Sequence, residues 1–378
     1  MKKITFNIFQ AIAIFIIIAI AASCTPSYVK PDYSIYVWPP QPQKTRIKLL
    51  DVIATDLDVR QMSQTESMFG YNAYFKFTKP HDIAADEAGN IIVTDTYLKE
   101  VFIINLEQKT IKSLANPKGW ISPFGVATDD KNKLLVVTDQ NKAYVFSLIN
   151  FRLIGMIEDK RFQVLNGVAL DPERRFIYLC DTRGSAIYKF DYQGAFIQQV
   201  AEGGGREQDV YFPSNLALDS QGNLFVTDTM HWKIKSYDPK GNFRFAWGVH
   251  GSVPGQFNRP KGIAINRDDI LIITDNDLNL FQLFTPTGQP YLYVGGAGTG
   301  PGRFSLPAGV FVDKNNKVYV VDQTNRRFQV FQMYTDSYYT ELERQAAAMV
   351  NATGAIVNAT DAPADVAPAA QRENQGGQ

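Results

Sequence analysis

The stretch PSNLALDSQGNLFVTDTMHWKIKSYDPKGNFRFAWG, at residues 213–248, decides the fold of this protein. It contains four short runs rich in β-branched, aromatic and other apolar residues, which favour β-strands. These runs are NLALD, NLFVTD, KIKSYD and FRFAWG. Gly222 separates the first two and Pro239-Lys240-Gly241 separates the last two, and such residues set the backbone angles of tight turns. The stretch therefore predicts one four-stranded antiparallel sheet.

The start of this stretch recurs along the chain as Pro-x-Gly-apolar-Ala-x-Asp, a turn, an apolar run and a closing Thr-Asp or a close variant. Its six copies are PHDIAADEAGNIIVTD, PFGVATDDKNKLLVVTD, LNGVALDPERRFIYLCD, PSNLALDSQGNLFVTD, PKGIAINRDDILIITD and PAGVFVDKNNKVYVVD. The closing aspartates are separated by 44, 42, 47, 47 and 47 residues and are Asp95, Asp139, Asp181, Asp228, Asp275 and Asp322. A repeat of roughly 40–50 residues with room for four strands is typical of a propeller blade. We therefore predict an all-β fold, a six-bladed β-propeller of four-stranded antiparallel blades.

The two ends of the repeat region predict how the ring closes. The sixth copy ends near RRFQVFQMY, its third strand, and has no fourth run after it. The run RIKLLDVIATDLDV, at residues 46–59, is strand-like and precedes the first copy. We expect this N-terminal strand to complete the last blade, because an open sheet edge favours aggregation. The propeller would then occupy residues 46–334, and residues 60–79, including Met68-Phe69-Gly70, would form the loop into the first blade.

Two glycine-rich stretches give a resemblance to a known family. They are GVHGSVPGQFNRPKGIAI from Gly248 and GGAGTGPGRFSLPAGVFV from Gly295, and both contain Gly-x-Phe-x-x-Pro-x-Gly before a blade. Over about residues 46–334 the sequence resembles the NHL-repeat propellers. Some members of that family bind RNA through a basic face. This chain has 38 basic and 38 acidic residues and a formal net charge of zero, so we expect no nucleic-acid partner.

The first 24 residues have the features of an export signal. Two lysines precede an apolar run at residues 11–22, which is too short to span a bilayer. The following AASC, at residues 21–24, resembles a bacterial lipobox, which implies cleavage before Cys24 and acylation of that residue. An ordinary secretory signal and an uncleaved anchor are the alternatives. We expect an exported protein, lipid-anchored to the cell envelope, and Thr25 after the cysteine favours the outer membrane.

The segments on either side of the propeller are expected to be extensions of it. Residues 25–45 contain five prolines, which favour an extended and semi-rigid tether. The signal and tether also resemble those of lipoproteins found beside multihaem cytochromes in metal-reducing bacteria. That resemblance implies an exported protein partner, such as a multihaem cytochrome. Residues 335–378 are expected to form a short helix and a disordered tail.

The residues that usually carry chemistry give no catalytic or metal constellation. The six repeated aspartates are expected to fix turns, because six equivalent positions share one role. His81, His231 and His250 lie in different repeats without metal-ligand spacing, and the residues that match His81 in the other copies are Phe124, Asn166, Ser214, Lys261 and Ala308. No Cys-x-x-Cys-His motif for covalent haem is present, and Cys180 is expected to be a buried thiol. We therefore predict no enzyme activity and no cofactor, with calcium near the axis left open.

The loops that vary between repeats are the predicted binding surface, because variable loops on a rigid scaffold are where binding usually resides. The candidates are His81, Tyr97, Lys99, Phe124, Arg183, His231, Trp232, Lys261, Arg326 and Arg327. The predicted function is a membrane-anchored, extracytoplasmic protein-binding scaffold, for example in a cytochrome or envelope electron-transfer complex. Two alternatives are a metal-dependent enzyme similar to propeller lactonases or lyases, and a carbohydrate or small-ligand sensor in which Trp232 and Tyr97 stack on sugars.

Overall fold

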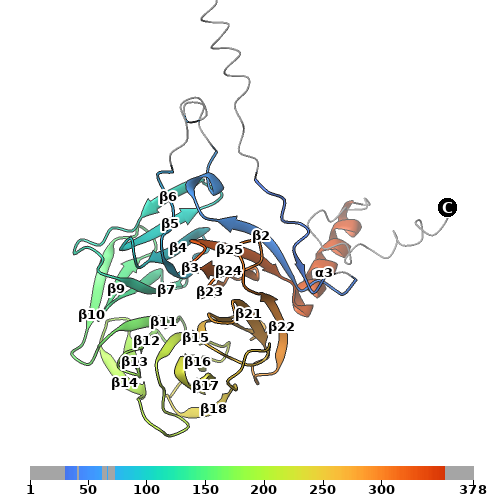
Figure 1. The fold of residues 1–378 in the computed structure, drawn as a ribbon. Helices are drawn as coiled ribbons and strands as arrows, with labels where there is room; N and C mark the ends of the chain where they lie inside the picture. The colour runs from blue at the N-terminus through green and yellow to red at the C-terminus, as the bar shows by residue number, and fades with distance from the viewer. Residues whose placement is uncertain (1–29, 41, 62–65, 67–72, 354–378) are drawn as a thin grey trace, which may run out of the picture.

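A computed structural model describes residues 30–40, 42–61, 66 and 73–353. Six antiparallel sheets surround a central axis (Figure 1), which confirms the predicted six-bladed β-propeller. Three features of the sequence analysis lie outside the described residues: the signal with Cys24, the Met68-Phe69-Gly70 loop, and the tail from residue 354. Among the helices of the described part, none combines the length and the apolar character needed to cross a membrane.

Five blades each take four consecutive strands, and the first strand of each lies nearest the axis (Figure 1). Blade 1 has β3 (Pro80–Ala85), β4 (Asn90–Asp95), β5 (Glu100–Asn105) and β6 (Thr110–Ser113). Blade 2 has β7 (Pro123–Asp129), β8 (Leu134–Asp139), β9 (Lys142–Ser147) and β10 (Leu153–Glu158). Blade 3 has β11 (Leu165–Asp171), β12 (Phe176–Asp181), β13 (Ala186–Asp191) and β14 (Phe196–Ala201). Blade 4 has β15 (Pro213–Leu218), β16 (Leu224–Asp228), β17 (Lys233–Tyr237) and β18 (Phe243–Trp247), and blade 5 has β19 (Pro260–Ile265), β20 (Leu271–Asp275), β21 (Leu280–Phe284) and β22 (Pro290–Gly295).

Blade 6 joins the two ends of the propeller, as predicted. It contains β23 (Pro307–Val312), β24 (Lys317–Asp322) and β25 (Arg327–Met333), and its fourth strand is β2 (Ile47–Ile53). The pairing of β2 with β25 is antiparallel and runs from Ile47 opposite Met333 to Ile53 opposite Phe328. The N-terminal strand therefore closes the ring by hydrogen bonds to a strand almost three hundred residues later.

The tether contributes more to the fold than an extended linker would. Its short strand β1 (Val37–Trp38) pairs with β2 and becomes a fifth strand of blade 6. The Trp38 ring packs edge-on against Phe331, with ring centroids 5.9 Å apart, and Tyr33 and Tyr36 pack against the same core cluster. The aromatic residues of the tether are thus used to cover the outer side of the closing strand.

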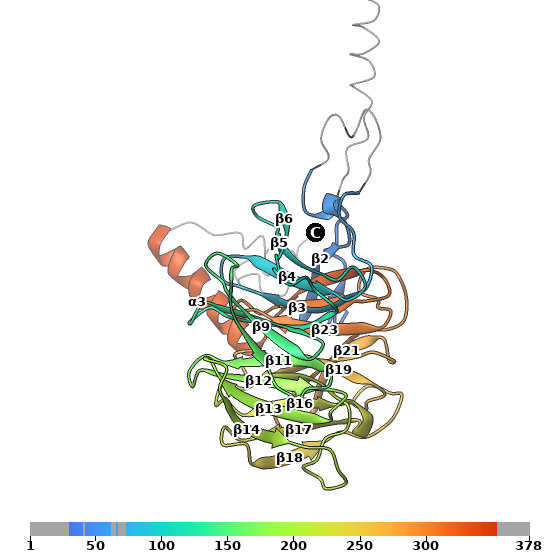
Figure 2. The ribbon, with the colours of Figure 1, turned by 90° about the vertical axis from the view of Figure 1, so that its left-hand side faces the viewer.

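Helical segments are few and peripheral in the described residues. Two 3₁₀ turns, η1 (Asp56–Asp58) and η2 (Thr229–His231), lie in loops, and α3 (Asp336–Thr353) follows blade 6. Figures 1 and 2 show α3 at the periphery of the ring. Its first turn is attached by the Tyr339 hydroxyl, which donates to the Thr45 carbonyl at 2.6 Å.

Glycines of the repeat motif allow adjacent inner strands to approach each other closely. A Cβ atom on Gly125 would lie 2.0 Å from the carbonyl oxygen of Asn166 in the next blade. The same atom on Gly262 would lie 2.4 Å from the carbonyl oxygen of Ala308. At these two positions a side chain would therefore overlap the backbone of the neighbouring blade.

Because adjacent inner strands lie so close, the threonine side chains of the closing Thr-Asp form hydrogen bonds from one blade to the next. Each hydroxyl donates to a carbonyl on the following inner strand, and the pairs are Thr94 with Phe124 (2.7 Å), Thr138 with Asn166 (2.6 Å), Thr227 with Lys261 (2.7 Å) and Thr274 with Ala308 (2.5 Å). Blade 6 has Val321 at this position, and there the Gln323 side chain donates to the Pro80 carbonyl of blade 1 at 3.0 Å. A polar bond therefore also spans the boundary where the ring closes.

The repeated aspartates are buried and bind the loops. Asp95 accepts hydrogen bonds from the amides of Thr78 and Leu98, at 2.7 and 3.0 Å. Asp275 accepts from the amides of Asn258 and Arg259, at 2.8 and 3.0 Å. These contacts tie the connection between blades to the loop after the second strand. The ends of these loops are therefore held by hydrogen bonds, even where the residues at the loop tips differ between blades.

We expect Gly125→Ala to lower the free energy of unfolding by about 1–3 kcal/mol, because the added methyl must push the Asn166 carbonyl away. Gly205→Ala is the control, since no atom lies within 4 Å of its added Cβ. Thermal and denaturant unfolding of both variants would check this. Equal stability of the two variants would show that the close approach is not required.

Candidate functional site

One face of the ring, the loop face, is formed by the loops between second and third strands and by the connections between blades. Of the predicted binding residues, Tyr97, Lys99, Arg183 and Arg326 are exposed in these loops. Tyr97 is the most open of the large apolar side chains here, at 70% exposure. The geometry leaves these four side chains available to a partner, and their role in binding stays a prediction.

Two other predicted binding residues are committed to contacts within the fold. Arg327 is only 9% exposed, pairs with Asp322 at 2.7 Å, and donates to the carbonyls of Thr299 and Gly300. It therefore differs from the sequence interpretation, because a guanidinium bonded in this way is not offered to a partner. His231 is partly exposed, but its Nδ1 lies 2.8 Å from the buried carboxylate of Asp228.

Trp232 is a partly buried residue of the loop face. Its backbone φ is +55°, in the left-handed region. Bulky residues rarely adopt this region, and Trp232 does so in a tight loop. Its ring lies against the His250 ring, with centroids 4.5 Å apart. One surface of the indole is thus covered by the next connection between blades, which leaves less of it to stack on a sugar.

Exposed apolar side chains gather on the loop face, and sequence reasoning missed most of them. They come from the loops after the second strands of blades 1 and 4 and from four connections between blades, and are Tyr97, Leu98, Ile121, Tyr211, Phe212, Met230, Val249, Val253 and Leu306. No periodic pattern marks such residues, since they occur singly or as adjacent pairs in loops. Only the folded structure shows that these side chains are exposed in loops of the same face.

The opposite face is formed by tight turns that carry mostly charged and polar residues. Ion pairs there link neighbouring blades, such as Lys131 with Glu173 at 2.5 Å and Lys314 with Glu87 at 2.9 Å. Ile149, in the turn between β9 and β10, is a large apolar side chain exposed on this side, at 77%. The two faces therefore differ in composition: the loop face has more of the exposed large apolar side chains, and the opposite face has the ion pairs between turns.

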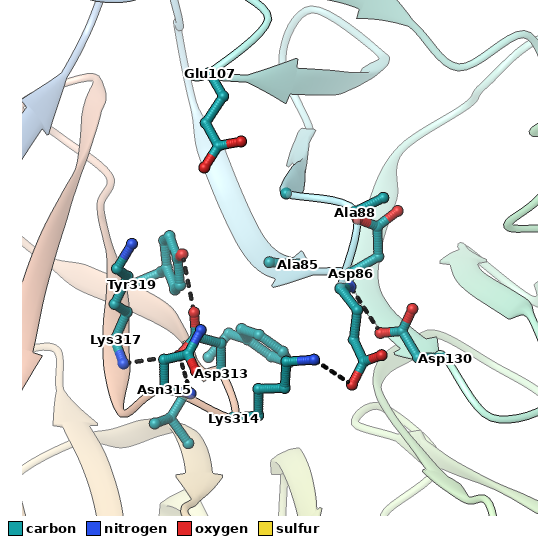
Figure 3. Close-up of a pocket in the computed structure, with 14 residues that line it drawn as sticks. Ala85, Asp86, Ala88, Glu107, Asp130, Asp313, Lys314, Asn315, Lys317 and Tyr319 are labelled. Carbon is teal, nitrogen blue, oxygen red and sulfur yellow. Dashed lines mark hydrogen bonds and ion pairs between the residues drawn. The ribbon is translucent and has the colours of Figure 1, made fainter. Parts of the chain in front are cut away.

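A cavity of about 290 Å³ lies on the charged face, between blades 6 and 1 (Figure 3). Some of its charged groups have partners across a blade boundary. Lys314 pairs with Glu87, and the backbone amide of Glu87 donates to Asp130 at 3.0 Å. Tyr319 donates its hydroxyl to Asp313 at 3.4 Å. We interpret this cavity as a contact region between blades, because these bonds across its wall connect blades 6, 1 and 2.

The axis of the ring opens on the loop face at a ring of six equivalent residues, one from the start of each inner strand. These residues, here called the axial mouth, are His81, Phe124, Asn166, Ser214, Lys261 and Ala308. His81 is 8% exposed, its ring contacts that of Phe124, and it hydrogen-bonds to the Phe124 backbone. Burial lowers the pKa of His81 well below its ordinary value, so the imidazole is neutral. Its Nδ1 is buried and has no partner in the described part of the chain.

The next position inward closes the axis. Four blades have glycine there, whereas blade 1 has Asp82 and blade 4, directly opposite, has Asn215. The two side chains hydrogen-bond across the axis. Burial raises the pKa of Asp82 to about 7, even though the Val126 amide donates to its carboxylate at 3.1 Å. Below this pair runs an axial channel of about 170 Å³ that is lined by residues of the inner strands.

Lys261 places a cation at the axial mouth. Burial, together with the nearby charges of Arg259 and Lys79, lowers the pKa of Lys261 to about 8. Within the described residues its ammonium forms no ion pair or hydrogen bond that would anchor it. The mouth is therefore a partly buried cationic site with unused donors.

The donor set of the mouth does not suit a divalent metal ion. In the described residues, no three side chains of His, Cys, Asp or Glu are close enough to hold one. Asp82 is the carboxylate at this level, and Lys261 exerts a coulombic effect on it. Calcium takes six to eight oxygen ligands, and zinc takes three or four protein ligands from Cys, His, Asp or Glu, so this set fits neither ion.

Sequence comparisons agree with this architecture. Residues 140–255 match the family described as SMP-30/gluconolactonase/LRE-like region, and residues 256–353 match a family described as 6-bladed beta-propeller. The chain is a six-bladed β-propeller. Each match covers less than half of the propeller chain. Among curated protein sequences, none matches it significantly.

Several solved structures share the fold of the propeller. A structural genomics protein of unknown function from Bacteroides thetaiotaomicron is similar with a TM-score of 0.58 and 14% identity, over 76% of each chain. An auxiliary nutrient binding protein from the same organism gives 0.55 and 14%, over 68% of this chain and 69% of that one. A catalytically inactive virginiamycin B lyase from Staphylococcus aureus with quinupristin gives 0.53 and 15%, over 70% and 98%. Identities this low show a shared fold and no more.

The buried Asp82 makes stability depend on pH. Its folded pKa of about 7 lies above its ordinary value of 3.8, so the folded state holds a proton that the unfolded chain releases. Stability therefore falls as pH rises from about 4 to 7, by up to roughly 4 kcal/mol. We expect Asp82→Asn to be more stable than the unaltered protein at pH 8 and not at pH 4.5. Denaturant unfolding at both pH values measures this, and a difference that does not change with pH would contradict it.

Proposed function

We propose that this propeller is a binding module whose loop face docks an exported protein. The observation that carries the proposal is the set of exposed apolar side chains on that face, set against a charged opposite face. Soluble monomers rarely expose clustered apolar side chains, and such patches usually mark protein interfaces. Tyr, Phe and Met are also among the residue types that most often form the core of an interface.

Neighbouring contacts make this face suitable for docking. Tyr211 and Phe212 pack edge-on with ring centroids 5.4 Å apart, and the Met230 amide donates to the Tyr211 carbonyl. These three exposed side chains therefore sit together on well-anchored backbone. Exposed lysine and arginine side chains lie in the same set of loops, including Lys99, Arg183 and Arg326. A partner with an apolar centre and acidic groups around it would match this surface.

A role in the cell envelope is part of the proposal. The signal and the cysteine at residue 24 support an exported protein that is anchored by lipid, in the outer membrane. The resemblance of the tether to lipoproteins found beside multihaem cytochromes supports such a cytochrome as the partner. Binding rather than catalysis is favoured because the axial mouth has no donor set for a catalytic metal.

We expect Cys24→Ser to move the protein from the membrane fraction to the soluble fraction, since the thiol that accepts lipid is lost. Cys180→Ser is the matched control, because that thiol is fully buried in the propeller. Immunoblots of fractionated cells would measure the distribution. Continued membrane association of the Cys24 variant would argue against the lipid anchor.

The docking proposal predicts that Tyr211→Ser combined with Met230→Ser lowers recovery of the partner by about tenfold or more, since apolar anchors dominate interface energies. Cross-linking in intact cells, followed by affinity capture and haem staining, would measure a cytochrome partner. Ile149→Ser is the control, because it removes an exposed apolar side chain from the opposite face. Equal haem recovery with both variants, or none with the unaltered protein, would overturn the proposal.

A further inference from the structure

The described chain begins at the rim of the ring, on the outer edge of blade 6. Lys30 forms an ion pair with Asp51 of β2, so the backbone there lies beside the closing strand. Figures 1 and 2 both show this segment at the circumference of the ring, away from the central axis. A propeller that is held by its N-terminal segment is therefore held at its rim and not at the centre of either face.

The tether forms a turn on this rim whose tip points into solvent. The Ser34 amide donates to the Asp32 carboxylate at 2.8 Å, and the Tyr36 amide donates to the Tyr33 carbonyl at 3.0 Å. Tyr33 and Tyr36 are partly buried, with ring centroids 6.4 Å apart. Ile35 lies between them along the chain and is 77% exposed. The turn therefore presents an apolar side chain outward on a backbone that is held by hydrogen bonds.

Leu50 adds a second exposed apolar side chain to the same rim. The Leu49 amide donates to the Tyr36 carbonyl at 2.9 Å, so the turn lies alongside the middle of β2. Side chains alternate along β2: Leu49 and Asp51 are buried, and Leu50 between them is 37% exposed. Ile35 and Leu50 thus belong to adjacent segments of the rim.

Lysine side chains lie on these same segments. They are Lys30, whose side chain stays 45% exposed despite its ion pair, Lys48 of β2, and Lys76, which bridges to the segment directly after β2. Asp32 is an exposed acid in the turn. Exposed aliphatic groups among lysines match a phospholipid surface, because its anionic headgroups attract lysine and its acyl boundary accepts apolar side chains.

These three lysines, Ile35 and Leu50 form one surface, here called the N-terminal edge. We propose that the N-terminal edge lies on the phospholipid surface of the membrane that holds the lipid anchor, so that the propeller stands on its rim. The inference rests on the proposed acylation of Cys24. Six residue-to-residue steps separate Cys24 from Lys30, and even a fully extended chain of that length spans at most roughly 20 Å. The acyl chains therefore keep Lys30, and the edge beside it, close to the headgroups.

This orientation leaves both faces of the ring uncovered by lipid. The loop face then points along the membrane, where it can meet another protein of the same envelope. The alternative orientation places the apolar loop face itself on the bilayer. The rim is favoured because the tether reaches the ring there and because the lysines of the tether and of β2 are exposed there.

Spin labels on single added cysteines test the orientation in the acylated full-length protein, reconstituted into vesicles of phosphatidylethanolamine and phosphatidylglycerol. Cys24 carries the lipid and Cys180 is fully buried, so the label reacts with the added cysteine. For labels at Ile35→Cys and Leu50→Cys, the ratio of collisions with oxygen to collisions with a water-soluble nickel chelate should be several-fold higher than at Ile149→Cys. Ile149 is the matched control, because it is the same residue type, is also 77% exposed and lies in a turn of blade 2.

A label at Tyr97→Cys reports on the loop face and should give the same low ratio as the Ile149 label. A high ratio at Tyr97 would show that the loop face lies on the bilayer, and it would overturn the inference. Low ratios at both Ile35 and Leu50, in protein that floats with the vesicles, would overturn it as well and leave the lipid anchor intact. Failure of the unaltered protein to float with vesicles contradicts the anchor, and the inference fails with it.

Discussion

The contact on which the propeller depends is the close approach of each inner strand to the next. In four blades a glycine leaves room for this approach, and in four blades a threonine hydroxyl bonds a backbone carbonyl of the following blade. Both residues come from the same repeat motif, so the motif specifies the joint between blades as well as the blade itself. Because the joint is made by backbone and small side chains near the axis, the loops further out are free to differ.

The sequence predicted the fold well because the repeat interval and the turn residues are local signals. Ring closure was predicted for the same reason, since the last repeat lacked a strand that the first residues could supply. The tether was harder: the prolines of residues 25–45 suggested an extended linker, but Trp38 packs on Phe331 and adds β1 to blade 6. That contact joins residues far apart in the chain, and no local sequence pattern predicts it.

The binding residues were only partly predictable. Arg327 and Arg326 look alike in the sequence, but the strand register points Arg327 to Asp322 and leaves Arg326 exposed. The unusual chemistry of the axis comes from Asp82 and Asn215, which replace the glycine of the motif in opposite blades. A sequence shows the two departures separately, whereas only the closed ring brings them together. Burial then raises the pKa of Asp82 and lowers the pKa of Lys261, and the amino-acid sequence alone does not show this burial.

The fifth strand of blade 6 has a mechanical consequence. Tension applied to the chain at residue 30 acts on the Lys30–Asp51 ion pair and on β1 before it acts on the pairing of β2 with β25, because both contacts lie outside that pairing. The two-residue pairing of β1 and the Trp38 contact can detach while the longer β2–β25 pairing remains whole. Under a pull on the N-terminal side, the contacts of the outermost strand would therefore break first, and the pairing that closes the ring would stay intact.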